Sequence, residues 1–167
     1  MERRQISSEE LGVLYQLLGE GVWYLQNLED ALHSCITVKR DIRIRGSVSL
    51  EKGMKILAKN RAQVLGKSIK DAKEAGIFNQ SLQDRLEEFK EERNWLIHRS
   101  VHEKREDLYV DETRFALMER IKKFSEEALQ LQSILCQELE DFVFSQDISK
   151  ESVYRQAQQK IKELKGD

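Results

Sequence analysis

Apolar residues recur every three or four positions along most of the chain, which is the spacing of one face of an α-helix. Ser7 precedes the first such row, and Glu10 three residues later completes a capping box. The row contains Leu11, Leu14, Leu18, Gly21, Leu25, Leu28, Leu32 and Cys35. It predicts a helix from Ser7 to about Thr37, packed within a bundle or pairing with a second copy of itself.

The remaining rows predict four more helices, over residues 49–75, 81–100, 111–144 and from 149 onward. Each begins with a side chain that caps helices: Ser49, Ser81, Asp111 or Ser149. The apolar row of the second helix is Leu50, Met54, Leu57, Val64 or Leu65, Ile69 and Ala72. The last helix is short, and its row is Val153, Ala157, Ile161 and Leu164.

Two polar stretches between these helices are predicted to be loops. Residues 102–107 are all polar or charged, and residues 39–47 carry Arg40, Arg43 and Arg45, the last two alternating with isoleucines. Most cationic runs of this kind are simply solvated. The alternative is that the three arginines contact phosphate groups of a substrate.

Four long helices and one short one predict an all-α fold, a single domain over residues 1–167 built as an up-and-down helical bundle. The composition agrees, because the chain has no proline, only 8 glycines and many good helix formers. A chain of 167 residues is also long enough to bury a hydrophobic core.

Charge and hydropathy narrow the class of protein. The net charge of −2 means that any nucleic-acid site is local rather than a property of the whole surface. We find no apolar run of about 18 residues and no signal-peptide core, which predicts a cytoplasmic protein without a membrane span. Cys35 and Cys136 fall on apolar rows, so we interpret them as reduced core thiols, with a disulfide as the alternative.

The chemistry is concentrated late in the third predicted helix. Arg93 falls on the apolar row of that helix, where a guanidinium needs a partner, such as Glu88, Glu92 or a carboxylate on a neighbouring helix. His98 follows Asn94 by four residues, so the Asn94 amide can hydrogen-bond the imidazole and orient it. The alternative is a structural ion pair beside a surface histidine.

Arg93 and His98 are five residues apart, so they point about 140° apart on a straight α-helix. Two arrangements bring such groups to one substrate atom: the helix distorts, or two copies of the chain share the site across a two-fold axis. The guanidinium groups then stabilise a phosphate in the transition state, and the imidazoles exchange protons.

Guanidinium and imidazole groups placed in this way suit metal-independent cleavage of RNA. A base removes the proton of the 2′-hydroxyl, which attacks the adjacent phosphorus and leaves a 2′,3′-cyclic phosphate and a 5′-hydroxyl. DNA lacks that hydroxyl and is not cut in this way. The step requires no metal ion or other cofactor. Arg99, next to His98, joins Arg40, Arg43 and Arg45 as a candidate substrate-binding cation.

The segment 93–98 resembles the signature of the HEPN superfamily. In that signature, four to six residues separate an arginine from a histidine, and the residue after the arginine is often polar. Here four residues intervene, and Asn94 takes the polar position. The small all-α bundle and the late place of the motif in a long helix are also similar to that family. The resemblance implies a homodimer whose motifs meet at the interface, with Arg93 and His98 catalytic and Asn94 supporting them.

The resemblance further implies an endoribonuclease of a toxin or phage-defence system, acting on single-stranded RNA and restrained by an antitoxin or regulatory protein. One toxin branch of the family continues as His-x-Tyr, and His98-Arg99-Ser100 departs from it. The superfamily also includes inactive members, so the alternative is a non-catalytic module that binds RNA, a nucleotide or another protein.

Other constellations are weaker. His98 and His102 share a helical face, but Arg99 stands where a zinc protease has glutamate, and no third metal ligand is near in sequence. We therefore predict no metal site. Trp23 and Trp95 are interpreted as core or interface residues rather than as a platform for stacking bases.

Overall fold

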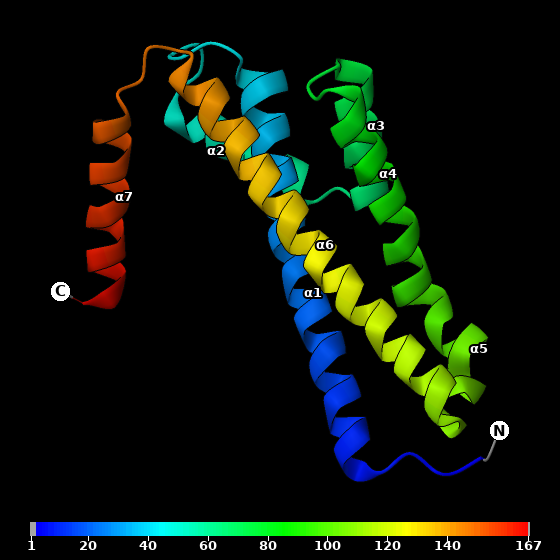
Figure 1. The fold of residues 1–167 in the computed structure, drawn as a ribbon. Helices are drawn as coiled ribbons and strands as arrows, with labels where there is room; N and C mark the ends of the chain where they lie inside the picture. Colours follow the sequence, from blue (N-terminus) through cyan, green and yellow to red (C-terminus); the bar gives the residue numbers. More distant parts are fainter. Residues whose placement is uncertain (1–2, 167) are drawn as a thin grey trace.

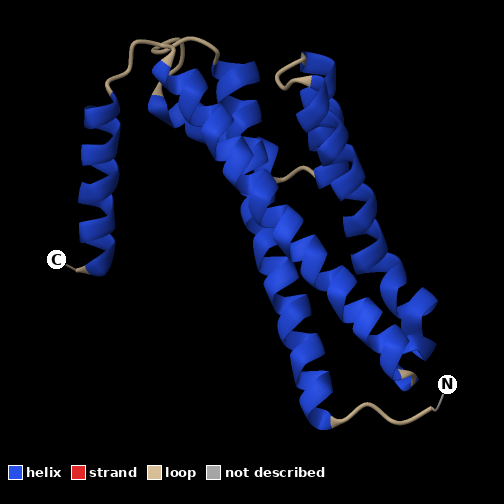
Figure 2. Cartoon of the chain, in the orientation of Figure 1, coloured by secondary structure: helices blue, strands red, loops and turns tan. Residues whose placement is uncertain are grey.

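The computed structural model describes residues 3–166, and these residues form helices joined by short connections (Figure 2). The two longest helices, α1 (Ser8–Ile36) and α6 (Asp111–Phe144), pack along one another through the middle of the molecule (Figure 1). Helix α4 (Gln80–Asn94) lies on one side of this pair and also packs against α6. The all-α helical bundle predicted from the sequence is confirmed.

Helices α1 and α6 run in the same direction. Near their starts, Arg114 of α6 pairs with Glu10 of α1 at 3.0 Å, and near their ends the Cys35 thiol donates to the Leu135 carbonyl at 3.2 Å. The predicted leucine row of α1 is buried in this contact, together with Ile121, Phe124, Ala128, Leu131 and Leu135 of α6. Because its own chain covers it, the row is a bundle contact rather than a surface for pairing with a second copy.

The start of α1 is fixed as its sequence predicts. The Ser7 side chain accepts from the Glu10 amide, and the Glu10 carboxylate accepts from the Ser7 amide, which confirms the capping box. Arg4 donates to Glu10 at 2.6 Å and pairs with Asp111 at 2.8 Å. These hydrogen bonds from Arg4 hold the pKa of the Glu10 carboxyl well below its usual range.

The sequence predicts one helix over residues 49–75, and this prediction is wrong in one respect. The structure has two helices there, α2 (Leu50–Arg61) and α3 (Leu65–Ala75). Asn60 is buried at the end of α2, and its side-chain N–H groups donate to Thr37 and Asp41, both at 2.8 Å. These contacts fix the end of α2 against η1, and Val64 then takes an extended conformation. The chain reverses at this break, which is why α6 runs parallel to α1.

The break also changes which side chains are buried. In α2, the predicted core residues Leu50 and Met54 are 84% and 54% exposed. In α3, Leu65, Ile69 and Ala72 are buried as predicted. Only the half of the row that reaches the bundle core therefore packs as the sequence suggests.

Both predicted loops contain helical turns. A π-helix, η1 (Thr37–Ile42), extends α1 into the arginine-containing stretch. The predicted loop over residues 102–107 lies in α5 (Ser100–Lys104) and the 3-10 helix η3 (Arg105–Tyr109). Charged side chains stabilise these short turns, for example Lys104 with Asp107 at 3.2 Å. Periodicity of apolar residues gives no signal for helices of this kind.

Helix starts are predicted with mixed success. Ser49 and Ser149 cap α2 and α7 (Lys150–Lys165) as expected, each accepting from the amide three residues later. The cap of α4 is Asn79 rather than Ser81, and Asp111 is the first residue of α6 rather than its cap. An acidic residue in the first turn still complements the helix dipole.

The two cysteines differ. Cys35 is buried in the core, and burial raises its pKa to about 12. Cys136 is exposed on α6, so its interpretation as a core thiol is wrong, and both cysteines are free. Its neighbour Leu135 takes the buried position in the contact with α1, and Cys136, one residue later, points to another side of α6.

Helix α7 stands away from the rest of the bundle (Figure 1). Its contacts are made at its first turns, where Tyr154 packs edge-on against Phe144 and donates to Glu140 at 3.3 Å. None of its residues is fully buried: in the predicted apolar row, Val153 is partly buried and Ala157, Ile161 and Leu164 are exposed. Among residues 3–166, no helix is long and apolar enough to cross a membrane.

Candidate functional site

The helix that carries the motif changes its register at the motif. Residues Trp95–Arg99 form a π-helix, η2, in which the Ser100 amide donates to the Trp95 carbonyl five residues earlier. Such a turn places residues five apart nearly one above the other, and π-turns are frequent at functional sites. Arg93 and His98 therefore meet within one chain, and their Nη1 and Nε2 atoms are 3.2 Å apart. The helix distortion, one of the two expected arrangements, is therefore present, and the site shared between two copies stays a prediction.

The contact defines the state of the imidazole. A guanidinium can only donate hydrogen bonds, so Arg93 Nη1–H donates and His98 Nε2 accepts. The contact therefore requires the tautomer in which Nε2 carries no proton. His98 is exposed, so a substrate can reach the imidazole.

Asn94 is directed to the arginine rather than to the histidine. Its Oδ1 accepts from Arg93 Nη1–H at 3.3 Å. The expected hydrogen bond between Asn94 and His98 is not formed among the contacts of the described residues. Asn94 and His98 thus flank the same guanidinium nitrogen, and the polar residue after the arginine orients the arginine itself.

Arg93 has no ion-pair partner among residues 3–166. Its Nε–H is buried and meets no acceptor in that part of the chain. Glu92, an expected partner, instead pairs with Arg120 of α6 at 2.8 Å. An arginine without a carboxylate partner keeps donors free for an anionic ligand.

The charge of Arg93 acts across the helix interface on Glu29 of α1. Burial raises the pKa of the half-buried Glu29 carboxyl above its ordinary value, while the Arg93 charge acts in the opposite direction. Glu29 is four residues after Leu25 and three before Leu32 on the core face of α1. A glutamate at this core-facing position is the feature of the sequence from which Glu29 could have been predicted to belong to the site.

Trp95 anchors the π-turn to two other elements. Its ring is 3% exposed, and the Arg120 guanidinium carbon lies 3.4 Å from the ring centroid. Its indole Nε1–H donates to Glu103 of α5 at 3.0 Å. Trp95 is a core residue, as interpreted from the sequence. Its partner Arg120 lies on a distant helix and has no signal in the sequence.

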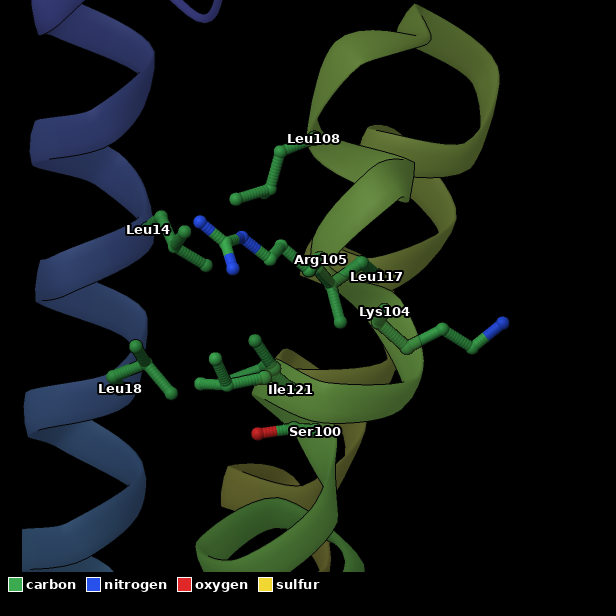
Figure 3. Close-up of a pocket in the computed structure, with 9 residues that line it drawn as sticks. Leu14, Leu18, Ser100, Lys104, Arg105, Leu108, Leu117 and Ile121 are labelled. Atoms are coloured by element: carbon green, nitrogen blue, oxygen red, sulfur yellow. The ribbon is translucent and has the colours of Figure 1, made fainter.

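An apolar pocket of about 90 Å³ lies just beyond the π-turn, between α1, α5, η3 and α6. Figure 3 shows Leu14 and Leu18 of α1 on one side, and the Arg105 guanidinium reaching toward α1 while Lys104 points away. Val101 also lines this pocket and is exposed, and Ile97 precedes it by one turn. Two exposed apolar side chains, Ile97 and Val101, therefore lie close to His98 in the chain.

The candidate substrate-binding arginines lie in two places. Arg99 is beside the motif and faces Glu103 at 3.9 Å. Arg40, Arg43 and Arg45 follow the end of α1, whereas the π-turn lies near the start of α6 (Figure 1). Arg40 is held by Asp41 at 2.7 Å and by Asp71 at 3.3 Å, and these carboxylates raise the pKa of Arg40. The structure does not bring these three arginines to the Arg93–His98 pair.

His102 lies in α5 and is exposed. Within residues 3–166, no three His, Cys, Asp or Glu side chains are grouped so that they could hold a metal ion. The chemistry of the site is that of one guanidinium, one imidazole and one amide.

Comparison of the chain with protein-family models, with curated proteins and with solved structures found no match.

Proposed function

We propose that this protein is a metal-independent endoribonuclease of the HEPN type, which acts as a homodimer on single-stranded RNA in a toxin or phage-defence system. The observation that carries the proposal is the 3.2 Å contact between Arg93 and His98 across the π-turn. It joins a donor for phosphate oxygens to a proton acceptor at one exposed place. Asn94 orients the arginine.

The contact suggests how a substrate activates the site. A phosphate of the RNA accepts hydrogen bonds from the Arg93 guanidinium, which has no carboxylate partner in residues 3–166. His98 Nε2 then loses its donor and accepts the proton of the adjacent 2′-hydroxyl. The bond from O2′ to phosphorus forms, and the bond from phosphorus to O5′ breaks. The leaving O5′ receives a proton from His98 of the second copy, which has taken that proton from water, and the first His98 returns the proton of the 2′-hydroxyl to the solvent.

The surface around the motif supports a dimer that buries this site. Val101 and Ile97 are exposed beside His98, and Val101 lines a pocket with Leu18 of α1. Val22 follows Leu18 by one turn and is also exposed. Exposed apolar groups around a polar centre are typical of protein interfaces. A two-fold contact here places two Arg93–His98 pairs on one substrate groove.

The test is cleavage of single-stranded RNA of mixed sequence in EDTA. The wild type is expected to cut the RNA, and His98→Ala and Arg93→Ala are expected to cut at least about 100-fold more slowly. His102→Ala is the matched control, because His102 is an exposed histidine one turn later in the chain. Equal rates for the wild type and His98→Ala contradict the proposal.

The second candidate is a non-catalytic helical module that binds an antitoxin, a regulatory protein or RNA. It is favoured by α7, where Ala157, Ile161 and Leu164 of the apolar row are exposed and only Val153, in the first turn, is partly buried. In this case the wild type binds RNA or a protein without cutting RNA. Reversing the charges of Arg40, Arg43 and Arg45 then abolishes RNA binding if those residues form the binding surface.

A further inference from the structure

We propose that Arg120, Glu92 and Trp95 are positioning residues, which hold the π-turn in the register where Arg93 meets His98. The structural part of this inference concerns the contact alone, and its effect on catalysis rests on the proposed function. Glu92 and Arg120 lie outside the Arg-x4-His motif, and Trp95 occupies one of its four variable positions. They connect the motif-bearing helix to α6, so the alignment of the site depends on the packing between two helices.

Arg120 contacts both residues just before and at the start of the π-turn. Its Nε–H donates to one Glu92 carboxylate oxygen at 2.9 Å, and its Nη2–H donates to the other at 2.8 Å. The guanidinium plane also covers the Trp95 ring, with 3.4 Å from Cζ to the ring centroid. One side chain of α6 therefore contacts Glu92, directly before Arg93, and Trp95, two residues after it.

The other end of the turn is held by α5. Trp95 donates its indole N–H to Glu103 at 3.0 Å, which joins the first residue of η2 to a residue beyond its end. The Ser100 hydroxyl donates to the Leu96 carbonyl at 2.6 Å. The segment Trp95–Arg99 is thus fixed on both sides by side-chain contacts.

Contacts with other elements are needed to stabilise the π-turn, because a helix by itself favours the α-helical register. The π-helix is rare and occurs mostly as single turns within α-helices. A return to the α-helical register would place Arg93 and His98 about 140° apart and break their contact. An exposed ion pair alone stabilises little, but bidentate geometry and stacking on a buried indole add to it. Lysine cannot reproduce either feature.

The chain contains a matched control for this arrangement. Arg85 of α4 donates to Glu127 of α6 through Nε at 3.0 Å and through Nη2 at 2.8 Å. This pair joins the same two helices and is similarly exposed, with side-chain exposures of 35% and 36% against 38% and 47% for Arg120 and Glu92. Arg85 is eight residues before Arg93, so its pair lies away from the π-turn.

The experiment compares Arg120→Lys with Arg85→Lys in the full chain. The first readout is the imidazole ¹⁵N spectrum, in which the His98 signal is assigned by its loss in His98→Ala. We expect a shifted His98 signal in Arg120→Lys, because Nε2 loses its donor, and an unchanged signal in Arg85→Lys. The second readout is RNA cleavage, for which kcat is expected to fall about tenfold or more in Arg120→Lys with little change in KM.

Two outcomes overturn the proposal: a His98 signal that does not move in Arg120→Lys, or one that moves equally in Arg85→Lys. If the wild type cuts no RNA, the spectrum still decides the positioning role, while the proposed function fails by itself. If Arg120→Lys does not fold, Glu92→Gln takes its place, because it keeps the side-chain shape and weakens only the hold on Arg120. A His98 signal unmoved in Glu92→Gln then contradicts the proposal in the same way.

Discussion

His98 and Arg93 interact through a hydrogen bond in which only the guanidinium can donate. In the proposed reaction, the imidazole nitrogen that accepts at 3.2 Å is also the one that takes the proton of the substrate hydroxyl. Under that proposal, the contact occupies the acceptor nitrogen until a phosphate accepts hydrogen bonds from the guanidinium instead. This makes the geometry of the guanidinium, and not only its charge, important for the proposed reaction.

Replacement of Arg93 by lysine tests that point. Lysine keeps the positive charge but lacks the planar fork that can contact a phosphate, Asn94 and His98 together. We expect the single-turnover rate of RNA cleavage to fall about 100-fold in Arg93→Lys. Arg85→Lys is the control and should stay near the wild-type rate, because Arg85 pairs with Glu127 away from the π-turn. Full activity in Arg93→Lys contradicts the role of the fork.

A second histidine gives a prediction about stability. His33 is buried, and its Nε2 lies 2.9 Å from the Ser68 hydroxyl oxygen. Burial lowers the pKa of His33, and the Arg61 charge adds to this while Asp30 opposes it. The folded state thus binds fewer protons than the unfolded state, whose histidine titrates near pH ~6.5. The stabilising contribution is present above that pH and is lost as the pH falls below it toward the lower folded-state value.

Thermal unfolding of the wild type and of His33→Gln, measured between pH 8 and pH 5, checks this sign. The melting temperature of the wild type should fall more steeply below about pH 6.5 than that of the variant. Paired carboxylates such as Glu10 and Asp41 also have lowered pKa values, but they lose their charge at more acidic pH. Parallel curves for the two proteins rule out a neutral, buried His33.

At the scale of the elements, apolar periodicity predicts the long helices and misses the turns that build the site. The rows in α1 and α6 are buried as expected, because their packing depends on spacing along one helix. The π-turn depends on Arg120, which is 25 residues after Trp95 in sequence, and no local pattern in the chain encodes that contact. The break at residues 62–64 likewise depends on Asn60 reaching η1.

The central helix and the last helix should contribute very differently to stability. Leu32 of α1 is 0% exposed within the core, whereas Ile161 of α7 is 51% exposed. We expect Leu32→Ala to lower the free energy of unfolding by about 2–5 kcal/mol, through lost burial and a cavity. Ile161→Ala should change it by less than about 0.5 kcal/mol. Urea titrations of both variants measure the difference, and similar losses would mean that α7 packs on the bundle.

At the scale of the whole molecule, the sequence supports an all-α bundle but not the path of the chain. A continuous second helix would have made the fourth helix antiparallel to the first, and the break reverses the direction of α6. The candidate pair Arg93 and His98 could be predicted from sequence, and so could the need for a distortion or a second copy. The distortion and the role of Asn94 required the structure, since both depend on side-chain contacts.

Dimer formation through the motif surface is the prediction at this scale. Val101 is 78% exposed near the π-turn, and Leu164 of α7 is 77% exposed far along the chain, so the two form a matched pair. Val101→Glu should dissociate the dimer and abolish RNA cleavage, because it places a charge in an apolar interface. Leu164→Glu should leave both unchanged. Sedimentation velocity measures the assembly, and a dimer that survives in Val101→Glu contradicts this interface.

The most direct test of the central claim is the chemistry of the RNA ends, measured by mass spectrometry after digestion in EDTA. Attack by the 2′-hydroxyl predicts fragments that end in a 2′,3′-cyclic phosphate and begin with a 5′-hydroxyl. These fragments should be absent with His98→Ala and with DNA of the same sequence. Fragments with 3′-hydroxyl and 5′-phosphate ends, or the same fragments from His98→Ala, would contradict the assignment of Arg93 and His98 as the catalytic pair.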